Sequence, residues 1–265
     1  MTSSRLLSLA AGVIPELMMN PAKFVEVTAS AGWRATGVWF DKKSWSSATS
    51  REVKRRIDDS GIQVVDMEVI RLGKILDQGN ALIDAAMEVG AKNILVVSSL
   101  SSPEETADQL SHLCSLAETG SINICLEFMK FTSVKSLSDA LEVIQLIDAQ
   151  NIGILLDLLH VVRSGTTMSE IAACDPNLFP YVQWCDGNQQ PIGWSDSELI
   201  TDALDDRLIP AQGELNALEF ESLFDEGVPF SIEVRSKKLR DDFPDFEGRA
   251  RYVLEQTLAA LRISD

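Results

Sequence analysis

Short apolar stretches alternate along the chain with stretches whose apolar residues recur at helical spacing. RLLSLAA, NILVVS and IGILLD are typical of the first kind. Such runs, bounded by turn-forming residues, are characteristic of parallel strands that are buried on both faces. We predict strands at 5–11, 37–40, 62–70, 93–98, 123–129, 152–157, 181–185 and 229–234. We predict helices at 21–31, 50–60, 76–89, 103–118, 138–149 and 247–261, with a long polar connection between the last two strands.

This alternation of strand and helix predicts an α/β fold with parallel strands. Eight strands with intervening helices in 265 residues suit a (β/α)8 TIM barrel. A doubly wound open sheet would normally carry a glycine-rich turn after its first strand, and AAGVIPE has no such pattern. The chain shows no internal repeat or linker, so we predict a single domain over 1–265.

Composition narrows the classes of function. A formal charge of −17 argues against nucleic acid and against an anionic membrane surface as partners, and it suits a cation site built from carboxylates. The four cysteines form no CxxC pair, which predicts free thiols in a reducing compartment. No signal-peptide pattern opens the chain and no apolar run reaches membrane-spanning length, so a cytoplasmic location is the default expectation.

Functional side chains of a (β/α)8 barrel gather where its strands end. The predicted strand ends carry polar residues that interrupt or follow apolar runs: Glu68, Glu127, Asp157, His160, Gln183, Glu233 and Arg235. Strand alternation places Glu233 and Arg235 on one face, and Cys125 on the face of Glu127. Structural roles explain such a pattern on four consecutive strands poorly, although Asp157 taken alone could be a helix N-cap.

Three carboxylates and an amide oxygen in one barrel mouth would repel one another unless a cation balances them. We therefore predict that Glu127, Asp157, Gln183 and Glu233 bind a divalent metal ion. Mn²⁺, Mg²⁺ or Co²⁺ is favoured over Zn²⁺, because no imidazole clearly belongs to this ligand set.

Several motifs resemble the xylose isomerase-like barrel family, which includes sugar-phosphate isomerases, ketose epimerases, inosose dehydratases and endonuclease IV. They are LEFMK around Glu127, LLDLLH with Asp157 and His160, VQWCDG, IPAQGEL and FSIEV. The resemblance covers nearly the whole chain and implies metal ligands at Glu127, Asp157 and Glu233. On the seventh strand, Gln183 stands where most of the family has a histidine. A glutamine at this position resembles the bacterial barrel-type 3-dehydroshikimate dehydratases. The resemblance also implies that His160 faces the substrate, that Asp186 matches a family aspartate, and that a homodimer is a candidate assembly.

The leading functional prediction is a metal-dependent isomerase or epimerase of carbohydrate metabolism that acts on a small sugar or keto-polyol. Glu127 and Glu233 would take and return a proton next to a carbonyl, through an enediolate. A dehydratase, and hence a lyase, is the first alternative, with His160 as an acid that titrates near pH 6.5. An inactive barrel that serves as a binding or partner subunit is the second, because Gln183 replaces a usual ligand. DNA hydrolysis is set aside, because the chain has only two histidines and an acidic surface.

Five residues complete the predicted site as substrate-binding side chains: Arg235, Glu68, Arg71, Trp39 and Asp186. Glu68 and Arg71 could instead form a surface pair where a loop begins, and Trp39 could serve packing alone.

Overall fold

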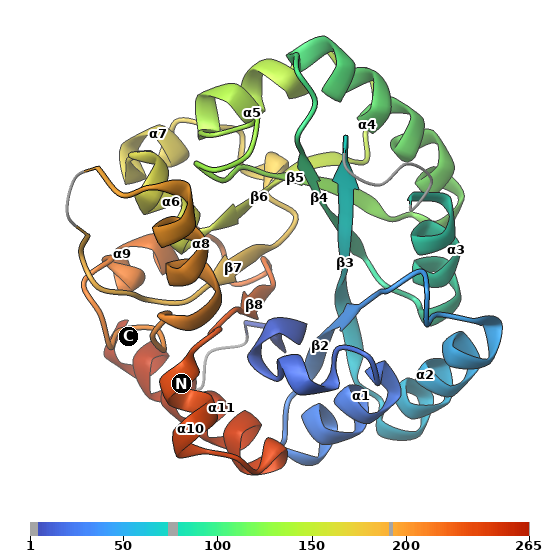
Figure 1. The fold of residues 1–265 in the computed structure, drawn as a ribbon, viewed down its shortest axis with the longest axis vertical. Coiled ribbons are helices and arrows are strands. Elements are labelled where there is room, and N and C mark those ends of the chain that lie inside the picture. The colour runs from blue at the N-terminus through green and yellow to red at the C-terminus, as the bar shows by residue number, and fades with distance from the viewer. Residues whose placement is uncertain (1–4, 74–78, 191–192, 265) are drawn as a thin grey trace.

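In the computed structural model, parallel strands β1 to β8 close into a barrel in sequence order, and helices surround it (Figure 1). The structure describes residues 5–73, 79–190 and 193–264. The strands are β1 (Leu7–Leu9), β2 (Ala35–Trp39), β3 (Gln63–Leu72), β4 (Asn93–Ser98), β5 (Asn123–Glu127), β6 (Ile152–Asp157), β7 (Val182–Trp184) and β8 (Phe230–Ile232). The prediction of a single (β/α)8 barrel is confirmed.

The α-helices follow the strands around the barrel. They are α1 (Pro21–Ser30), α2 (Ser47–Ser60), α3 (Gly79–Val89), α4 (Pro103–Ala117), α5 (Leu137–Ile144), α6 (Leu158–Ser164), α7 (Met168–Ala172), α8 (Asp196–Asp205), α9 (Ala217–Glu221), α10 (Lys237–Asp242) and α11 (Phe246–Ser264). Single 3-10 turns occur at η1 (Ala11–Val13), η2 (Pro15–Leu17), η3 (Glu118–Gly120) and η4 (Pro176–Leu178). Residues 76–78 of the predicted third helix lie outside the described residues.

Helices α6 to α10 were not predicted. Helix α6 begins directly at the end of β6, because the Asp157 side chain accepts hydrogen bonds from the first-turn backbone and caps the helix. Helix α8 lies in the connection predicted to be polar, and it begins with a capping box formed by Ser195 and Glu198. These helices are too short, or too polar, for their apolar residues to show a clear helical period.

Two apolar clusters separate the inside of the barrel from the layer beneath the helices. Alternate strand residues such as Ile124 and Leu126 belong to the large cluster, which also contains residues of the surrounding helices. The residues between them, Cys125 among others, belong to a small cluster with Val65, Leu95, Leu155 and Tyr181. Since successive strand residues point to opposite faces, the small cluster fills the barrel interior. Cys125 therefore shares the inward face with Glu127, as predicted.

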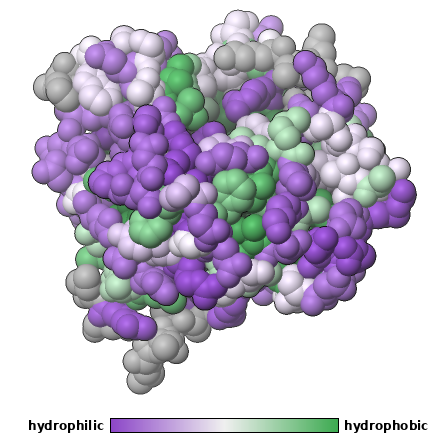
Figure 2. Space-filling view, turned by 60° about the horizontal axis from the view of Figure 1, so that its bottom comes forward, coloured by the Kyte–Doolittle hydropathy of each residue, from purple (hydrophilic) through white to green (hydrophobic). Residues whose placement is uncertain are grey.

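The side of the molecule in Figure 2 is mainly hydrophilic, with hydrophobic side chains confined to small areas. All four cysteines are free thiols, and Cys114, Cys125 and Cys185 are buried. Over the described part of the chain, every helix is too short or too polar to cross a membrane.

Candidate active site

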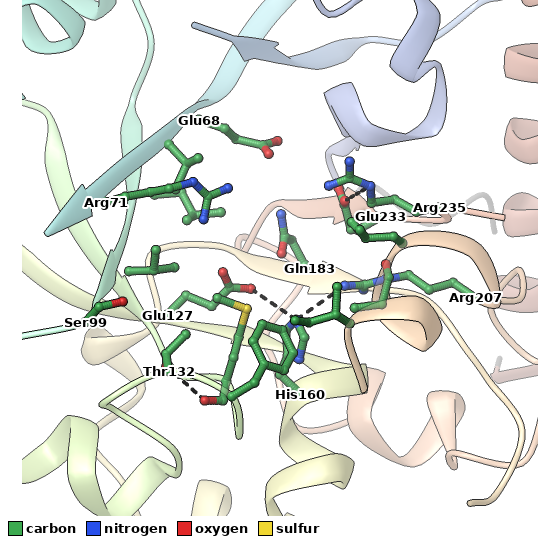
Figure 3. Close-up of a pocket in the computed structure, with 18 of the residues that line it drawn as sticks. Glu68, Arg71, Ser99, Glu127, Thr132, His160, Gln183, Arg207, Glu233 and Arg235 are labelled. Carbon is green, nitrogen blue, oxygen red and sulfur yellow. Dashed lines mark hydrogen bonds and ion pairs between the residues drawn. The ribbon is translucent and has the colours of Figure 1, made fainter. Parts of the chain in front are cut away.

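A cavity of about 300 Å³ opens among the C-terminal ends of the strands. Polar residues from strands and strand ends around the barrel line it, together with apolar residues that include Ile200 and Leu204 of α8. Figure 3 shows side chains from opposite sides of the barrel pointing toward one space. The lining includes eight of the predicted site residues: Trp39, Glu68, Arg71, Glu127, His160, Gln183, Glu233 and Arg235.

Strand register explains why these side chains meet. Trp39 is the register partner of Glu68 across β2 and β3, and Asp157 is the partner of Gln183 across β6 and β7. Glu127 is the last residue of β5. Because all eight strands are parallel, residues at their ends reach the same mouth of the barrel.

An ion pair and hydrogen bonds from the backbone hold Asp157 in place. Its Oδ1 accepts hydrogen bonds from the backbone N–H of Leu159 at 2.8 Å and of His160 at 3.4 Å. Its Oδ2 accepts one from Arg207 Nη1 at 2.6 Å. Burial disfavours the charged carboxylate, but the charge of the Arg207 guanidinium, together with the hydrogen bonds from Arg207 and from the backbone of His160, lowers the pKa of Asp157. Asp157 therefore serves as the helix N-cap considered from the sequence and is also part of the candidate site.

Three glutamates face the cavity, and nearby positive charge offsets the cost of their burial only in part. Burial, followed by the charge of Asp157, raises the pKa of Glu127 to about 8. Burial, followed by the charge of Glu233, raises the pKa of Glu68 well above its usual range. Burial is also the main reason that the pKa of Glu233 is raised. Glu68 Oε1 and Glu233 Oε2 are buried and have no hydrogen-bond partner among the described residues.

His160 lies in α6 and is 4% exposed. Its Nε2 is 3.9 Å from Glu127 Oε1 and 3.5 Å from Arg207 Nη2. Burial lowers the pKa of His160 to about 4, so the imidazole is neutral at neutral pH. This corrects the expectation of an unperturbed histidine that titrates near 6.5.

Two further arginines line the cavity. Among the described residues, Arg235 forms only one distant ion pair, with its Nε 4.0 Å from Glu233 Oε1. Arg71 forms no hydrogen bond or ion pair with the other described residues, and burial lowers the pKa of its guanidinium. The surface pair considered for Glu68 and Arg71 is absent from the described residues, and Figure 3 shows Arg71 and Glu68 on the side of the cavity opposite Arg207.

Asp186 lies outside the cavity lining, although sequence analysis placed it among the substrate-binding residues. Its Oδ1 accepts hydrogen bonds from the backbone N–H of Gly187 at 2.8 Å and of Leu215 at 2.9 Å. A Cβ atom on Gly213 would lie 2.6 Å from the same oxygen, so this close approach requires glycine. Asp186 thereby anchors the loop of the IPAQGEL motif, which follows Arg207 in the chain.

Two charged residues of this region, Arg207 and Asp66, were not among the predicted site residues. Arg207 directly precedes the LIPAQGEL stretch, and an isolated arginine there carries no sign that it will be buried. Asp66 occupies β3 two residues before Glu68 and accepts a hydrogen bond from Ser231 Oγ at 3.4 Å. Burial, followed by the charge of Glu233, raises the pKa of Asp66 to about 7. The alternation of Asp66 and Glu68 along VVDMEV was a usable sign of an acidic inward face.

The donor set suits a divalent cation. Glu127, Asp157 and His160 each offer a ligand atom within 4.8 Å of the others. Gln183 and Glu233 line the same cavity, and the orphaned Glu233 Oε2 is a buried acceptor without a donor. Burial, and after it repulsion between neighbouring carboxylates, raises the pKa values of Glu68 and Glu127, and a bound cation would oppose both effects. Of the four predicted ligands, Glu127 and Asp157 fall in this compact group, and His160 joins them there.

Glu127 provides a pH test of the metal-free protein. A carboxyl whose pKa is raised by folding stabilises the folded state below its unfolded pKa of about 4.3, and this contribution is lost as pH rises through about 8. In the presence of a chelator, we expect the melting temperature to fall between pH 5 and pH 9, and to fall less in Glu127→Gln. The control is Glu52→Gln, because ion pairing with Arg55 and Arg56 lowers the pKa of Glu52 to about 2 and keeps it ionised throughout this range. Equal slopes in wild type and Glu127→Gln would contradict the assignment.

The sequence profile of the family described as "Xylose isomerase-like TIM barrel" matches residues 22–247. The inosose isomerase of Bacillus subtilis (strain 168) is 22% identical over 153 residues, which are 54% of this chain and 52% of that protein. The chain spans about half of the length of the curated relatives that it matches.

Two solved structures superpose on almost the whole chain. One is described as IOLI protein with a binding zinc atom, at a TM-score of 0.75 and 17% identity, covering 97% of each chain. The other is the probable 3-DHS dehydratase AsbF of Bacillus anthracis, at a TM-score of 0.72 and 15% identity, covering 97% of this chain and 98% of that one. At such identities these structures establish the shared fold alone.

Proposed function

The chain belongs to the xylose isomerase-like TIM barrel family, and on that premise we propose that it is a divalent-metal-dependent enzyme that transfers a proton at a carbon next to a carbonyl. The proposed substrate is a small sugar or keto-polyol, and the proposed outcome is isomerisation or epimerisation through an enediolate. The observation that carries the proposal is the convergence of Glu127, His160, Gln183 and Glu233 on one cavity at the barrel mouth.

Glu127, Asp157, Gln183 and Glu233 are the proposed metal ligands. When bound, the ion would polarise the substrate carbonyl and acidify the neighbouring C–H bond. Mn²⁺, Mg²⁺ and Co²⁺ remain the favoured ions for an oxygen-rich set. The known relative with zinc keeps Zn²⁺ among the ions to be tested.

In the proposed reaction, side chains of this chain remove the proton and return it. Glu127 and Glu233 approach the cavity from β5 and from the end of β8, so one can remove a proton and the other return it on the opposite side. His160 enters as the neutral imidazole, which has one ring nitrogen able to accept a proton. This reverses the acid role expected for His160 from the sequence.

Dehydration is the second candidate, and the arginines favour it. Arg71 and Arg235 present guanidinium groups that are free of close ion pairs among the described residues, and such groups bind carboxylates. A polyhydroxylated keto acid would use these arginines, whereas a neutral sugar would leave them unpaired. A glutamine at the position of Gln183 resembles the 3-dehydroshikimate dehydratases, which also favours dehydration.

Metal content and proton exchange test the proposal together. The purified protein would be analysed for bound divalent ions and then incubated in D₂O with ketohexoses, inososes and polyhydroxylated keto acids. We expect close to one equivalent of ion and, for one substrate class, deuterium incorporation next to the carbonyl or loss of water. Absence of both metal and exchange would favour the remaining alternative, an inactive barrel that serves as a binding or partner subunit.

Replacement of His160 separates two roles. In His160→Asn we expect the metal to stay bound while turnover falls by roughly 10²–10⁴, the usual range for the loss of one acid–base group. Metal titration of the variant, read beside its exchange rate, measures both. If metal and activity are lost together, His160 is a ligand, as its proximity to Glu127 and Asp157 allows.

A further inference from the structure

Arg207 is a buried cation that contacts two members of the group that could hold a metal. It follows α8 in the chain and is only 3% exposed. Its Nε donates to the backbone oxygen of Ala203 at 2.9 Å, and its Nη1 contacts Cys185 Sγ at 3.5 Å. Figure 3 shows its side chain extending from one wall of the cavity toward His160 and Glu127.

The guanidinium contacts two of the side chains that could hold a metal ion, at the atoms that would bind it. A guanidinium only donates hydrogen bonds, so each partner must contribute a lone pair. Arg207 Nη1 lies 2.6 Å from Asp157 Oδ2, and Arg207 Nη2 lies 3.5 Å from His160 Nε2. The other oxygen of Asp157 is already bound to the backbone. Two of the three side chains in the metal-compatible group are therefore engaged by one internal cation.

We propose that Arg207 is a resident cation that competes with the divalent ion for Asp157 and His160. Metal loading then requires the guanidinium to leave Asp157, so the wild-type protein binds metal more weakly than its carboxylates alone would allow. The physical reason is that two cations near one buried carboxylate repel each other at low effective dielectric constant. This inference rests on the metal site of the proposed function.

A purely orienting role for Arg207 predicts the opposite result. Ligating carboxylates are often held by an outer hydrogen-bond partner, whose loss weakens metal binding. Removal of Arg207 would then lower the affinity for metal. The sign of the change in affinity therefore decides between competition and orientation.

The chain offers a matched control. Arg163 forms a second buried ion pair, with its Nε 2.9 Å from Asp202 Oδ2, and it lies outside the cavity lining. Arg163 stands three residues after His160, so its removal also takes one positive charge from the neighbourhood without freeing Asp157. The variants are Arg207→Gln, Arg207→Met, which keeps the aliphatic stem, and Arg163→Gln.

The experiment measures Mn²⁺ affinity by calorimetry on chelator-treated full-length protein, together with the melting temperature in chelator. For Arg207→Gln we expect Mn²⁺ to bind roughly 10-fold tighter or more, because a repelling charge has been removed at hydrogen-bond distance from a ligand. We also expect the metal-free form to melt at a lower temperature and to be rescued by Mn²⁺. Arg163→Gln should bind Mn²⁺ within about 3-fold of wild type, because Arg163 is paired with Asp202 rather than with Asp157 and the effect of a charge weakens with distance.

Several results would overturn the proposal. Equal or weaker Mn²⁺ binding by Arg207→Gln would leave the metal site standing and assign Arg207 an orienting role. Tightening of the same size in Arg163→Gln would trace the effect to general charge rather than to the contact with Asp157. If Arg207→Gln does not fold, Arg207→Met decides by the same comparison. Failure of every protein, wild type included, to bind a divalent ion would overturn the metal site and this inference together.

Discussion

Glu233→Gln is expected to abolish turnover while making the metal-free protein more stable. Glu233 is 4% exposed, its Oε2 has no partner among the described residues, and its pKa is raised, mainly by burial. A neutral amide of the same shape removes an unfavourable buried charge, so the melting temperature in chelator should rise. The same change removes a proposed ligand and proton carrier, so metal affinity should fall and turnover should drop by about 10²–10⁴ or more.

Thermal melting in chelator, metal titration and deuterium exchange measure these effects in one set of samples. Glu88→Gln is the control, because Glu88 is exposed on α3 and lies outside the cavity. It removes the same charge and should leave all three measurements close to wild type. A variant that loses stability along with activity would mean that Glu233 supports the fold instead of the chemistry.

Asp157→Asn is expected to cost the metal-free protein about 3–5 kcal/mol of unfolding free energy, because it leaves the Arg207 guanidinium buried without a counter-charge. For a chain of this size such a loss lowers the melting temperature by on the order of 10 °C. Side chains of both partners are almost fully buried, at 3% exposure for Arg207 and 0% for Asp157.

Denaturant unfolding in chelator measures the loss. The comparison is Asp58→Asn, which breaks the exposed i,i+4 pair with Lys54 on α2 and should cost at most about 1 kcal/mol. The double variant Asp157→Asn with Arg207→Met should recover much of the stability, since an apolar pair replaces an orphaned charge. Similar losses in Asp157→Asn and Asp58→Asn would contradict a buried ion pair at this position.

The barrel and most of its mouth could be predicted from local patterns. Apolar runs of strand length, separated by helical spacing, specify parallel strands that are covered on both sides. Parallel closure then brings every strand end to one mouth, so the sequence alone placed Glu127, Gln183 and Glu233 together. Arg235 followed from the two-residue periodicity that places it on the face of Glu233. Glu68 and Arg71 are three residues apart, and both reach the cavity because the register of β3 against β4 shifts between Met67 and Ile70.

The charge state of the site depended on contacts between distant segments. Arg207 meets Asp157 across 50 residues of sequence, and no local pattern records that meeting. The neutral His160, the raised pKa of Glu127 and the structural use of Asp186 follow from burial and from the partners that burial supplies. Helix α8, which brings Ile200 and Leu204 to the rim, forms within a stretch of largely polar sequence. Periodicity assigns a residue to a face, whereas desolvation and pairing depend on which side chains the closed barrel packs against it.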